Sequence, residues 1–380
     1  MKYYLIAGEA SGDLHGANLI GGLKKADPQS EFRFWGGDRM AEAGGAENLA
    51  RHYKTASFFG FIDVVRHLRT ILRQMRECRE DIKAFAPDVV ILIDYPGFNF
   101  KIAEFAHRQG LRTFYYISPK VWAWKESRVK LIRKYVDRLF IIFPFEKEYF
   151  AKRGIEAIYE GNPLVDAVEQ ERAAMPSRGE FLGQWGLPDD KPFIALLAGS
   201  RRSEINYNLP FMVELSKRFP EYRFVLAGVP WLEPSLYDKY IAGSGVEFVC
   251  SATYPLLAYS EAAVVTSGTA TLETALIGTP EFVCYRQDGL SIRIARLIIK
   301  IPFISLVNLI LGREAVRELI QEDMTMEKAS AELRAILPGG AKHGRMMEDY
   351  ADLRRVVGGA GASERFAARM VEILHREKNC

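Results

Sequence analysis

The chain has 380 residues, of which 48% are apolar and 26% charged, and its formal net charge is +3. This composition excludes an extended disordered chain and gives enough length for two globular domains. The small net charge gives no reason to expect a nucleic-acid partner.

The cysteines and the length of the apolar runs indicate in which cellular compartment the protein is expected. No run reaches the roughly 18 uncharged apolar residues of a membrane-spanning helix. The first apolar run is too short for a signal peptide, so we expect it to be the first strand. The cysteines lie far apart without C-x-x-C spacing, which predicts reduced thiols in a cytoplasmic protein at Cys78, Cys250, Cys284 and Cys380.

Short apolar runs alternate with amphipathic stretches through the first half of the chain. The run "DVVILID" at 88–94 is apolar almost throughout, as is typical of a strand buried on both faces of a parallel sheet. The alternation predicts βα units around such a sheet. The predicted strands are 3–7, 32–36, 88–94, 112–118 and 138–143, with helices at 14–25, 62–86 and 121–135.

The alternation pauses over 161–192, where four prolines predict a connection between domains with one or two short helices. It then resumes, and the tail from residue 313 onward has a helical pattern. Strands are predicted at 193–200, 223–228, 246–250, 262–268 and 281–285, with helices at 206–218 and 269–277.

These patterns predict an α/β protein of two Rossmann-like parallel-sheet domains facing a cleft. We expect residues 1–165 to form the first domain, completed by the C-terminal helices of 345–380, and residues 166–344 to form the second. Ligands of such sheets lie at the carboxyl ends of the strands, so the strand-end motifs are the candidate site.

The first motif, "AGEASGD" at 7–13, departs from the G-x-G-x-x-G dinucleotide fingerprint. Its small residues, Gly12 among them, would let an anion or a polar sugar approach backbone amides and a helix N-terminus. The alternative is a structural turn in which Ser11 or Asp13 caps the following helix.

The second motif, "LIDYPGFNF" at 92–100, places Asp94 at the tip of a buried strand. A carboxylate that is desolvated on one side suits a general base with a raised pKa. The alternative is a carboxylate that caps the helix beginning near Asn99.

The third motif, "AGSRRSEI" at 198–205, has Gly199 and Ser200 in a tight turn that presents the planar cation of Arg201. The alternative for Arg201 is an ordinary surface ion pair.

The fourth motif is "TSGTATLE" at 266–273. The backbone amides at 268–270 and the helix dipole suit a diphosphate, and Glu273 would accept the two hydroxyls of a ribose. The alternative is a helix capped by Thr269 with a solvated glutamate.

The sequence contains no D-x-D and no His or Cys cluster with metal-ligand spacing. We therefore predict a metal-independent reaction without a cofactor. The segment "YYISPKVWAWKESRV" at 115–129 is rich in aromatic residues that would pack in the core or line a sugar site.

Taken together, the motifs resemble those of the lipid-A-disaccharide synthases, glycosyltransferases of the two-Rossmann GT-B architecture. The resemblance covers nearly the whole chain, in order, through "AGEASGD", "SPKVWAWKESRV", "PFEKEYF", "GNPLVD", "LAGSRRSEI", "TSGTATLE" and "SLVNLILGREAVRELIQ".

The resemblance implies the inverting transfer of a sugar from UDP-2,3-diacylglucosamine to 2,3-diacylglucosamine 1-phosphate, with release of UDP, in lipid A biosynthesis. Asp94 would be the base that takes the proton of the acceptor 6-hydroxyl. The family carries a second acid soon afterwards where this chain has Gly97, which puts a two-carboxylate mechanism in doubt.

The remaining site residues are expected in two groups. The substrate side would be lined by Glu9, Ser11, Gly12, His15 and Asn99. The UDP side would be formed by Gly199, Ser200, Arg201, Ser267, Gly268, Thr269 and Glu273, with Tyr285 and Asn308 nearby.

Acylated substrates lie in a membrane, and the segment "FFGFIDVVRHLRTILRQMRE" at 58–77 has an apolar stripe flanked by arginines. That pattern is typical of an interfacial helix among anionic headgroups, and we expect peripheral association with the inner face of the cytoplasmic membrane. The alternative is a helix packed on the sheet. The expected contacts are Phe58, Phe59, Val64, Val65, Leu68, Arg69, Leu72 and Arg73.

Two other functions remain open from the sequence. One is another enzyme of the same architecture acting on a soluble UDP-sugar, such as a UDP-GlcNAc 2-epimerase. The other is a nucleotide-sugar or lipid-binding protein without turnover. The sequence also leaves a homodimer open.

Overall fold

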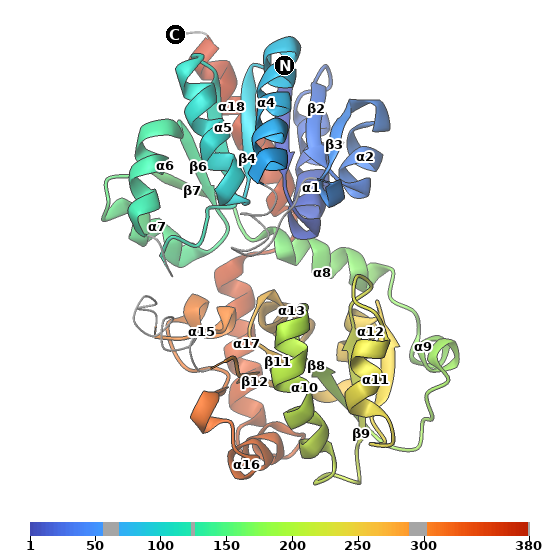
Figure 1. Ribbon diagram of the computed structural model, residues 1–380. Coiled ribbons are helices and arrows are strands. Elements are labelled where there is room, and N and C mark those ends of the chain that lie inside the picture. The colour runs from blue at the N-terminus through green and yellow to red at the C-terminus, as the bar shows by residue number, and fades with distance from the viewer. Residues whose placement is uncertain (56–67, 123–125, 289–301, 379–380) are drawn as a thin grey trace. The chain divides into compact units, whose positions relative to one another are not determined.

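The computed structural model describes residues 1–55, 68–122, 126–288 and 302–378. Its contacts divide the chain into two compact units, whose elements are labelled in Figure 1. Unit 1 comprises Met1–Pro163 and the segment from Ala360 onward, and unit 2 comprises Leu164–Gly359. The C-terminal segment that joins unit 1 is therefore shorter than the expected 345–380.

Unit 1 contains a parallel sheet of seven strands in the order β3-β2-β1-β4-β5-β6-β7. In chain order its strands are β1 (Lys2–Ala7), β2 (Glu31–Gly36), β3 (Leu49–His52), β4 (Val89–Ile93), β5 (Arg112–Tyr116), β6 (Arg138–Ile141) and β7 (Ala157–Tyr159). Its helices are α1 (Ala10–Ala26), α2 (Asp38–Gly44), α4 (Leu68–Phe85), α5 (Pro96–Arg108), α6 (Val129–Tyr135), α7 (Pro144–Ala151) and α18 (Ala362–Lys378).

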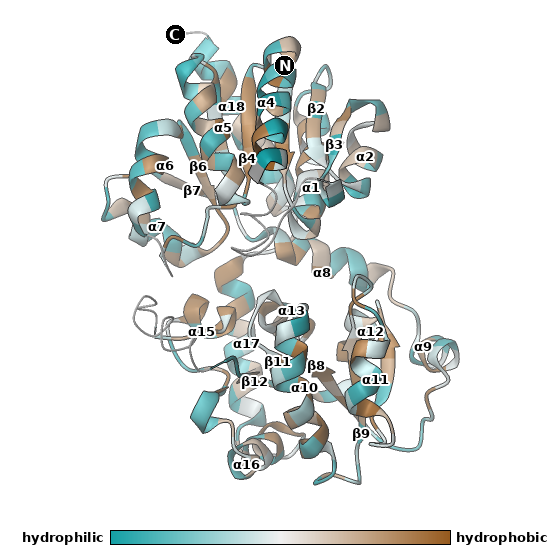
Figure 2. Ribbon diagram, in the orientation of Figure 1, coloured by the Kyte–Doolittle hydropathy of each residue, from teal (hydrophilic) through white to brown (hydrophobic). Residues whose placement is uncertain are grey.

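Helices cover both faces of this sheet, which explains why its central strands are apolar throughout. Figure 1 shows α4 and α5 in front of β4 and α18 behind it. All five residues of β4 are buried, and Figure 2 draws that strand in brown beside the largely teal α4. On the other face, Phe366 of α18 packs edge-on against Tyr116, with ring centroids 5.2 Å apart.

Unit 2 contains a parallel sheet of six strands in the order β10-β9-β8-β11-β12-β13. Its strands are β8 (Phe193–Leu197), β9 (Arg223–Gly228), β10 (Glu247–Cys250), β11 (Ser260–Thr266), β12 (Glu281–Tyr285) and β13 (Glu318–Ile320). Its helices are α8 (Pro163–Ala173), which begins at the unit boundary, α9 (Arg178–Trp185), α10 (Arg202–Ser216), α11 (Ser235–Ile241), α12 (Thr253–Ala258), α13 (Thr269–Ile277), α15 (Leu306–Leu311), α16 (Met326–Ile336) and α17 (His343–Val357).

Both sheets have the strand order of a doubly wound fold, which confirms the predicted class of two Rossmann-like α/β domains. The strand order reverses between β1 and β4 in unit 1, and between β8 and β11 in unit 2. Ala7 pairs with Ile93, and Leu197 with Val265, at these two points. The motifs that follow these strands therefore start side by side at each reversal, where ligands of such folds bind.

Three edge strands were not predicted from the sequence. β3, β7 and β13 have only three or four residues each, and most of their side chains are partly exposed. They therefore lack the continuous apolar run that marks a central strand. β13 also interrupts the tail that was expected to be helical, so that expectation was wrong at Glu318–Ile320.

The structure describes only some of the residues for which free thiols or membrane contact were predicted. Cys78 and Cys284 are buried free thiols, as predicted, and Cys250 is partly exposed, while Cys380 lies outside the described residues. Among the helices of the described part of the chain, none is both long and apolar enough to cross a membrane.

Candidate active site

In unit 1, the turns after β1 and β4 pack directly on each other. A Cβ placed on Gly8 would lie 2.2 Å from the ring of Tyr95, so only glycine fits beside that ring. Only the first residues of the "AGEASGD" motif form a turn, because α1 begins at Ala10 with Glu9 as its N-cap. The motif therefore serves close packing of the helix N-terminus against the Asp94–Tyr95 turn.

The backbone at Asp94 is held in an unusual conformation. Asp94 and Tyr95 both have positive φ, 41° and 45°, which is uncommon for residues other than glycine and costs on the order of 1–3 kcal/mol each. The Asp94 N–H donates to the Tyr116 carbonyl at 3.2 Å. The Asp94 carbonyl accepts from Asn99 Nδ2 at 2.8 Å and from the Tyr115 hydroxyl at 2.6 Å. Strain of this kind, fixed by surrounding hydrogen bonds, is typical of functional sites.

The side chain of Asp94 is partly buried at the carboxyl end of β4. Burial, followed by the charge of Glu9, raises the pKa of Asp94 to about 6, while Lys120 and Arg128 oppose the rise. A carboxyl with that pKa is ionised at neutral pH and is a stronger base than an ordinary aspartate, which is what proton abstraction requires.

The predicted residues of the segment after β1 differ in burial. The Ser11 hydroxyl donates to the carboxylate of Glu9 at 2.9 Å, so these two form a partly exposed pair at the start of α1. Gly12 is buried against Ala7 and Ile93, and His15 is partly buried one turn later.

Two side chains of unit 1, Asn99 and Asp13, bond to backbone groups of the protein. Asn99 is fully buried and its amide donates to backbone carbonyls, including that of Asp94, so its amide nitrogen is committed to the protein rather than offered to a substrate. Asp13 is 3% exposed and caps another helix, α2, by accepting from the N–H groups of Gly37 and Met40 at 2.6 and 3.1 Å. The sequence suggested a cap for its own helix instead.

In unit 2, the turn after β8 is closed by Glu204. Its carboxylate accepts from the N–H groups of Ser200 and Arg201 at 2.9 and 3.2 Å, and also from Arg201 Nη1 at 2.9 Å. Gly199 has φ 111°, and a Cβ there would lie 2.6 Å from Glu204. The Arg201 side chain is 76% exposed, so it is anchored at one nitrogen and otherwise presented to solvent.

An exposed aromatic side chain stands beside this turn. Trp231, 62% exposed, donates its indole N–H to the Ser200 carbonyl at 3.1 Å. Trp231 was not among the residues predicted from the sequence. Its place just after β9, the strand next to β8, was the available signal.

The turn after β11 leaves its first amides open. Gly268 and Thr269 are exposed at the N-terminus of α13, and nothing lies within 4 Å of a Cβ placed on Gly268. The Ser267 hydroxyl donates to the Ile304 carbonyl at 2.8 Å, which fixes the turn. The carboxylate of Glu273 accepts from the Tyr254 hydroxyl at 2.9 Å, and burial raises its pKa.

Of the two outer UDP-side residues, Tyr285 lies near the turns and Asn308 is buried within the protein. Burial and then the charge of Glu204 raise the pKa of Tyr285, whereas Arg201 lowers it, so these groups share one edge of the sheet. Asn308 is fully buried, and both ends of its amide bond to the protein, including Val316 and Glu318. Asn308 therefore holds the chain after α15 together rather than facing a ligand.

The predicted membrane helix is present from Leu68 as α4, and residues 58, 59, 64 and 65 lie outside the described part of the chain. Met75 and Cys78 of α4 pack in the core against the sheet. Leu72 is instead 58% exposed, with Arg69 and Arg73 exposed beside it. Part of the predicted apolar face is therefore core, and Leu72 with its arginines is the part that faces solvent.

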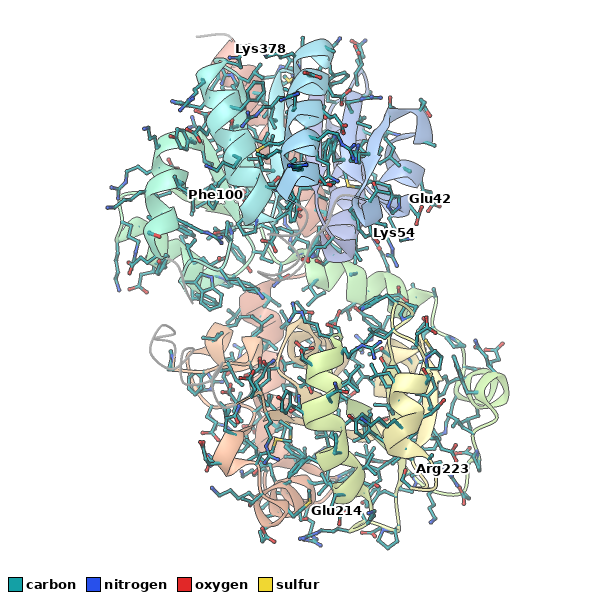
Figure 3. The ribbon with its side chains drawn as sticks, in the orientation of Figure 1. Glu42, Lys54, Phe100, Glu214, Arg223 and Lys378 are labelled. Carbon is teal, nitrogen blue, oxygen red and sulfur yellow. The ribbon has the colours of Figure 1, made fainter. Side chains whose placement is uncertain are left out.

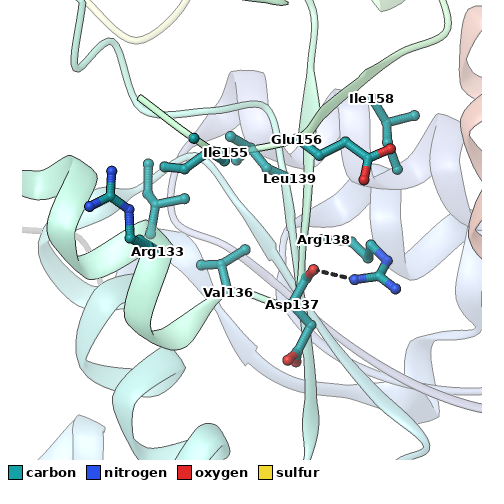
Figure 4. Close-up of a pocket in the computed structure, with 10 residues that line it drawn as sticks. Arg133, Val136, Asp137, Arg138, Leu139, Ile155, Glu156 and Ile158 are labelled. Atoms are coloured by element: carbon teal, nitrogen blue, oxygen red, sulfur yellow. Dashed lines mark hydrogen bonds between the residues drawn. The ribbon is translucent and has the colours of Figure 1, made fainter. Parts of the chain in front are cut away.

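One surface pocket of unit 1 lies at the opposite edge of the sheet. It has a volume of about 160 Å³ and is lined by residues at the starts of β6 and β7, among them Asp137 and Glu156 (Figure 4). No predicted site residue lines it. Within the described ranges, no group of three or more His, Cys, Asp or Glu side chains is gathered to hold a metal ion.

Solved structures share this architecture. A UDP-GlcNAc 2-epimerase from Neisseria meningitidis bound to UDP-GlcNAc superposes with a TM-score of 0.65 at 14% identity, covering 98% of this chain and 100% of that one. The epimerase from Methanocaldococcus jannaschii in complex with UDP-GlcNAc and UDP gives 0.63 at 14%, covering 99% and 100%. Identity this low shows the GT-B fold alone and does not favour epimerisation.

Sequence relatives are far closer. The lipid-A-disaccharide synthase of Syntrophus aciditrophicus is 39% identical over 383 residues, covering 99% of this chain and 98% of that protein. That of Myxococcus xanthus is 38% identical over 379 residues, covering 98% and 97%. The family described as lipid-A-disaccharide synthetase matches residues 3–365. The relatives and the family both match nearly the whole chain. The chain therefore belongs to the lipid-A-disaccharide synthase family, as the motifs indicated.

Proposed function

We propose that this chain transfers the sugar of UDP-2,3-diacylglucosamine to the 6-hydroxyl of 2,3-diacylglucosamine 1-phosphate by a single inverting displacement. The acceptor oxygen loses its proton to Asp94 and forms a bond to the anomeric carbon, while the bond from that carbon to UDP breaks. UDP leaves with the bonding electrons. The observation that carries the proposal is the raised pKa and fixed backbone of Asp94 at the β1–β4 reversal.

Asp94 acts as the sole base in this scheme. A single displacement needs only one base, so Gly97 in place of a second acid is no obstacle. Glu9 contributes by its negative charge, which keeps the Asp94 pKa high, and Ser11 orients Glu9 through their hydrogen bond. We assign Glu9, Ser11 and His15 to the substrate side, with Gly12 and Asn99 in positioning roles.

The UDP leaving group is assigned to unit 2. Its diphosphate would accept from the exposed backbone amides at Gly268 and Thr269, and Arg201 would balance its charge. Glu273, whose carboxylate accepts from the Tyr254 hydroxyl, would meet the ribose. Gly199 and Ser200 shape the turn, Ser267 fixes the neighbouring one, and Tyr285 lies beside Arg201.

The enzyme would meet its acylated substrates at the inner face of the cytoplasmic membrane without spanning it. Leu72 would enter the interface while Arg69 and Arg73 contact anionic headgroups. Leu68 at the start of α4 and the sequence of the preceding segment, with Phe58, Phe59, Val64 and Val65, extend the same apolar and basic pattern.

The test replaces Asp94 by asparagine and measures disaccharide and UDP formation in detergent, with a chelator present. Asp94→Asn should lower kcat at least about 100-fold. Its melting temperature at pH 7.5 should not fall, because an ionised, partly buried carboxylate no longer has to be accommodated. Near-normal turnover in this folded variant would remove Asp94 from the role of base.

A matched control lies at the other end of the same strand. Asp88 precedes β4 and pairs with Lys378 of α18 at 2.7 Å; Lys378 is labelled in Figure 3. Asp88→Asn should lower stability slightly and leave kcat unchanged.

A further inference from the structure

Trp231 is an exposed tryptophan of unit 2 to which the proposed chemistry gives no role. It follows β9 at the carboxyl edge of the sheet and is 62% exposed. No other large apolar side chain in the described part of the chain is exposed to that extent. A single exposed tryptophan is not unusual in itself, so its surroundings must decide whether it binds a ligand.

The indole of Trp231 is held in place at its polar end and through its backbone. Its N–H donates to the Ser200 carbonyl at 3.1 Å, in the turn after β8. Pro230 restricts the backbone directly before it. The Val229 N–H donates to the hydroxyl of the buried Tyr237 at 3.1 Å, which fixes the start of the same loop. The ring is thus both exposed and restrained, so a planar ligand that covers it loses little conformational entropy.

The loop of Trp231 lies in line with the two turns assigned to UDP. The strands β9, β8 and β11 are neighbours in the sheet and are labelled in Figure 1. The turn after β8 presents Arg201, and the turn after β11 presents the amides of Gly268 and Thr269. Neighbouring strands are about 4.8 Å apart, so the loops after β9 and β11 begin about 10 Å from each other. A nucleoside diphosphate is long enough to span that distance.

The proposed ribose contact indicates the direction of the base. Glu273 of α13 accepts from the Tyr254 hydroxyl at 2.9 Å, and Tyr254 lies on α12, which packs against both α13 and β9. In a nucleotide the ribose separates the base from the diphosphate. With the diphosphate at the start of α13 and the ribose at Glu273, the base extends toward α12 and β9, and Trp231 is the exposed aromatic residue on that side.

We propose that Trp231 stacks on the uracil base of the UDP-sugar, with its ring fixed by the hydrogen bond to Ser200. This inference rests on the proposed function and adds to it the residue that covers the base. Aromatic side chains stack on the π-faces of bases, and replacing one by alanine lowers affinity about ten-fold or more. The contact is the same in the substrate complex and in the transition state, so it lowers KM and leaves kcat unchanged.

The test measures the affinity of the full chain for UDP and for 5,6-dihydro-UDP by calorimetric titration. The two nucleotides share their charge, ribose and hydrogen-bonding groups, but the saturated ring of dihydro-UDP has no aromatic face. The unmodified chain should therefore bind UDP more tightly than dihydro-UDP. Trp231→Ala should bind UDP about ten-fold more weakly and should lose the preference for UDP. Its KM for the UDP-sugar should rise by the same factor, with kcat and the KM for the acceptor unchanged.

Further variants separate stacking from the hydrogen bond of the indole. Trp231→Phe keeps an aromatic face and removes the N–H, so it should retain most of the affinity for UDP and the preference over dihydro-UDP. Tyr207→Ala is the matched control, because Tyr207 is an exposed aromatic residue of α10 in the same unit. It should bind both nucleotides as the unmodified chain does. If Trp231→Ala melts early, Trp231→Leu repeats the test with an apolar side chain that has no aromatic face.

Three outcomes would overturn the inference. Unchanged UDP affinity in Trp231→Ala would exclude the base contact, and weaker co-sedimentation of that variant with phosphatidylglycerol vesicles would then make Trp231 a membrane contact. Equal losses of affinity for UDP and dihydro-UDP would mean that the ring does not stack on the base. A loss in Trp231→Phe as large as in Trp231→Ala would mean that the indole acts through its bond to Ser200. Failure of the unmodified chain to bind UDP would instead overturn the proposed function.

Discussion

The side-chain amide of Asn99 donates a hydrogen bond of 2.8 Å to the backbone carbonyl of Asp94. The same carbonyl accepts from the Tyr115 hydroxyl at 2.6 Å. Both donors are fully buried, so water cannot replace them. They hold the backbone at Asp94 and Tyr95, where both residues have positive φ. Asn99, which was predicted to lie on the substrate side, thus holds the backbone of Asp94, the proposed base.

Asn99→Ala should lower both stability and turnover, because it removes a buried donor to the Ile93 and Asp94 carbonyls. We expect a loss of about 2–3 kcal/mol in unfolding free energy and at least about ten-fold in kcat, with KM for both substrates unchanged. Tyr115→Phe removes one donor only and should cost about 1 kcal/mol. Denaturant unfolding and steady-state kinetics measure both. A rise in KM without loss of kcat in Asn99→Ala would restore it to the substrate side.

The acid limb of the pH profile should report Asp94. Its pKa is raised to about 6 in the folded protein, so lowering the pH through that value protonates the base and lowers kcat/KM. Glu9→Gln removes one cause of the raised pKa and should move the limb toward lower pH. A limb that stays in place in Glu9→Gln would mean that the charge of Glu9 does not act on the base.

Much of the fold could be predicted because buried parallel strands leave continuous apolar runs, as "DVVILID" does. The candidate residues next to these runs, Asp94 and Arg201, were found for the same reason. The roles of Asp13 and Asn308 could not be predicted, since each bonds to backbone groups that only the folded chain brings near. Trp231 was missed because an exposed aromatic side chain leaves no periodic pattern.

Two glycines of unit 2 should respond differently to alanine. Gly199→Ala places a Cβ against Glu204 at a residue with φ 111°, so we expect a loss of about 1–3 kcal/mol in stability together with weaker UDP binding. A Cβ on Gly268 meets nothing within 4 Å, so Gly268→Ala should fold normally and still bind UDP at least ten-fold more weakly. Thermal melts measure the stability of the two variants, and calorimetric titration measures their affinity for UDP. Normal UDP affinity in Gly268→Ala would show that UDP does not approach this residue closely enough to meet an added Cβ.

Membrane contact through α4 can be separated from core packing by two neighbouring residues. Leu72 is 58% exposed, so Leu72→Ser should reduce co-sedimentation with anionic vesicles without changing the melting temperature. Met75 packs in the core, so Met75→Ser should lower the melting temperature. Unaltered vesicle binding in Leu72→Ser would locate the lipid contact elsewhere.

Glu281 should make the stability of unit 2 fall as the pH rises. Its side chain is fully buried at the start of β12, and neither carboxyl oxygen has a hydrogen-bond partner. Burial raises its pKa well above the ordinary 4.5, so the folded protein holds this proton to a higher pH than the unfolded chain does. Above pH 4.5 the unfolded chain has released this proton and the folded chain retains it. Between these two pKa values, each unit by which the pH rises therefore lowers the free energy of unfolding by up to about 1.4 kcal/mol.

Glu281→Gln keeps the shape of the side chain but cannot ionise. The difference in melting temperature between this variant and the unmodified chain should be small at pH 5 and should grow in favour of the variant toward pH 8. Glu261, exposed on the neighbouring β11, gives the control, since Glu261→Gln should show no such growth. A constant difference for Glu281→Gln across this range would show that Glu281 is ionised or paired in the folded protein. A growing difference would identify a carboxylic acid that unit 2 keeps protonated at neutral pH.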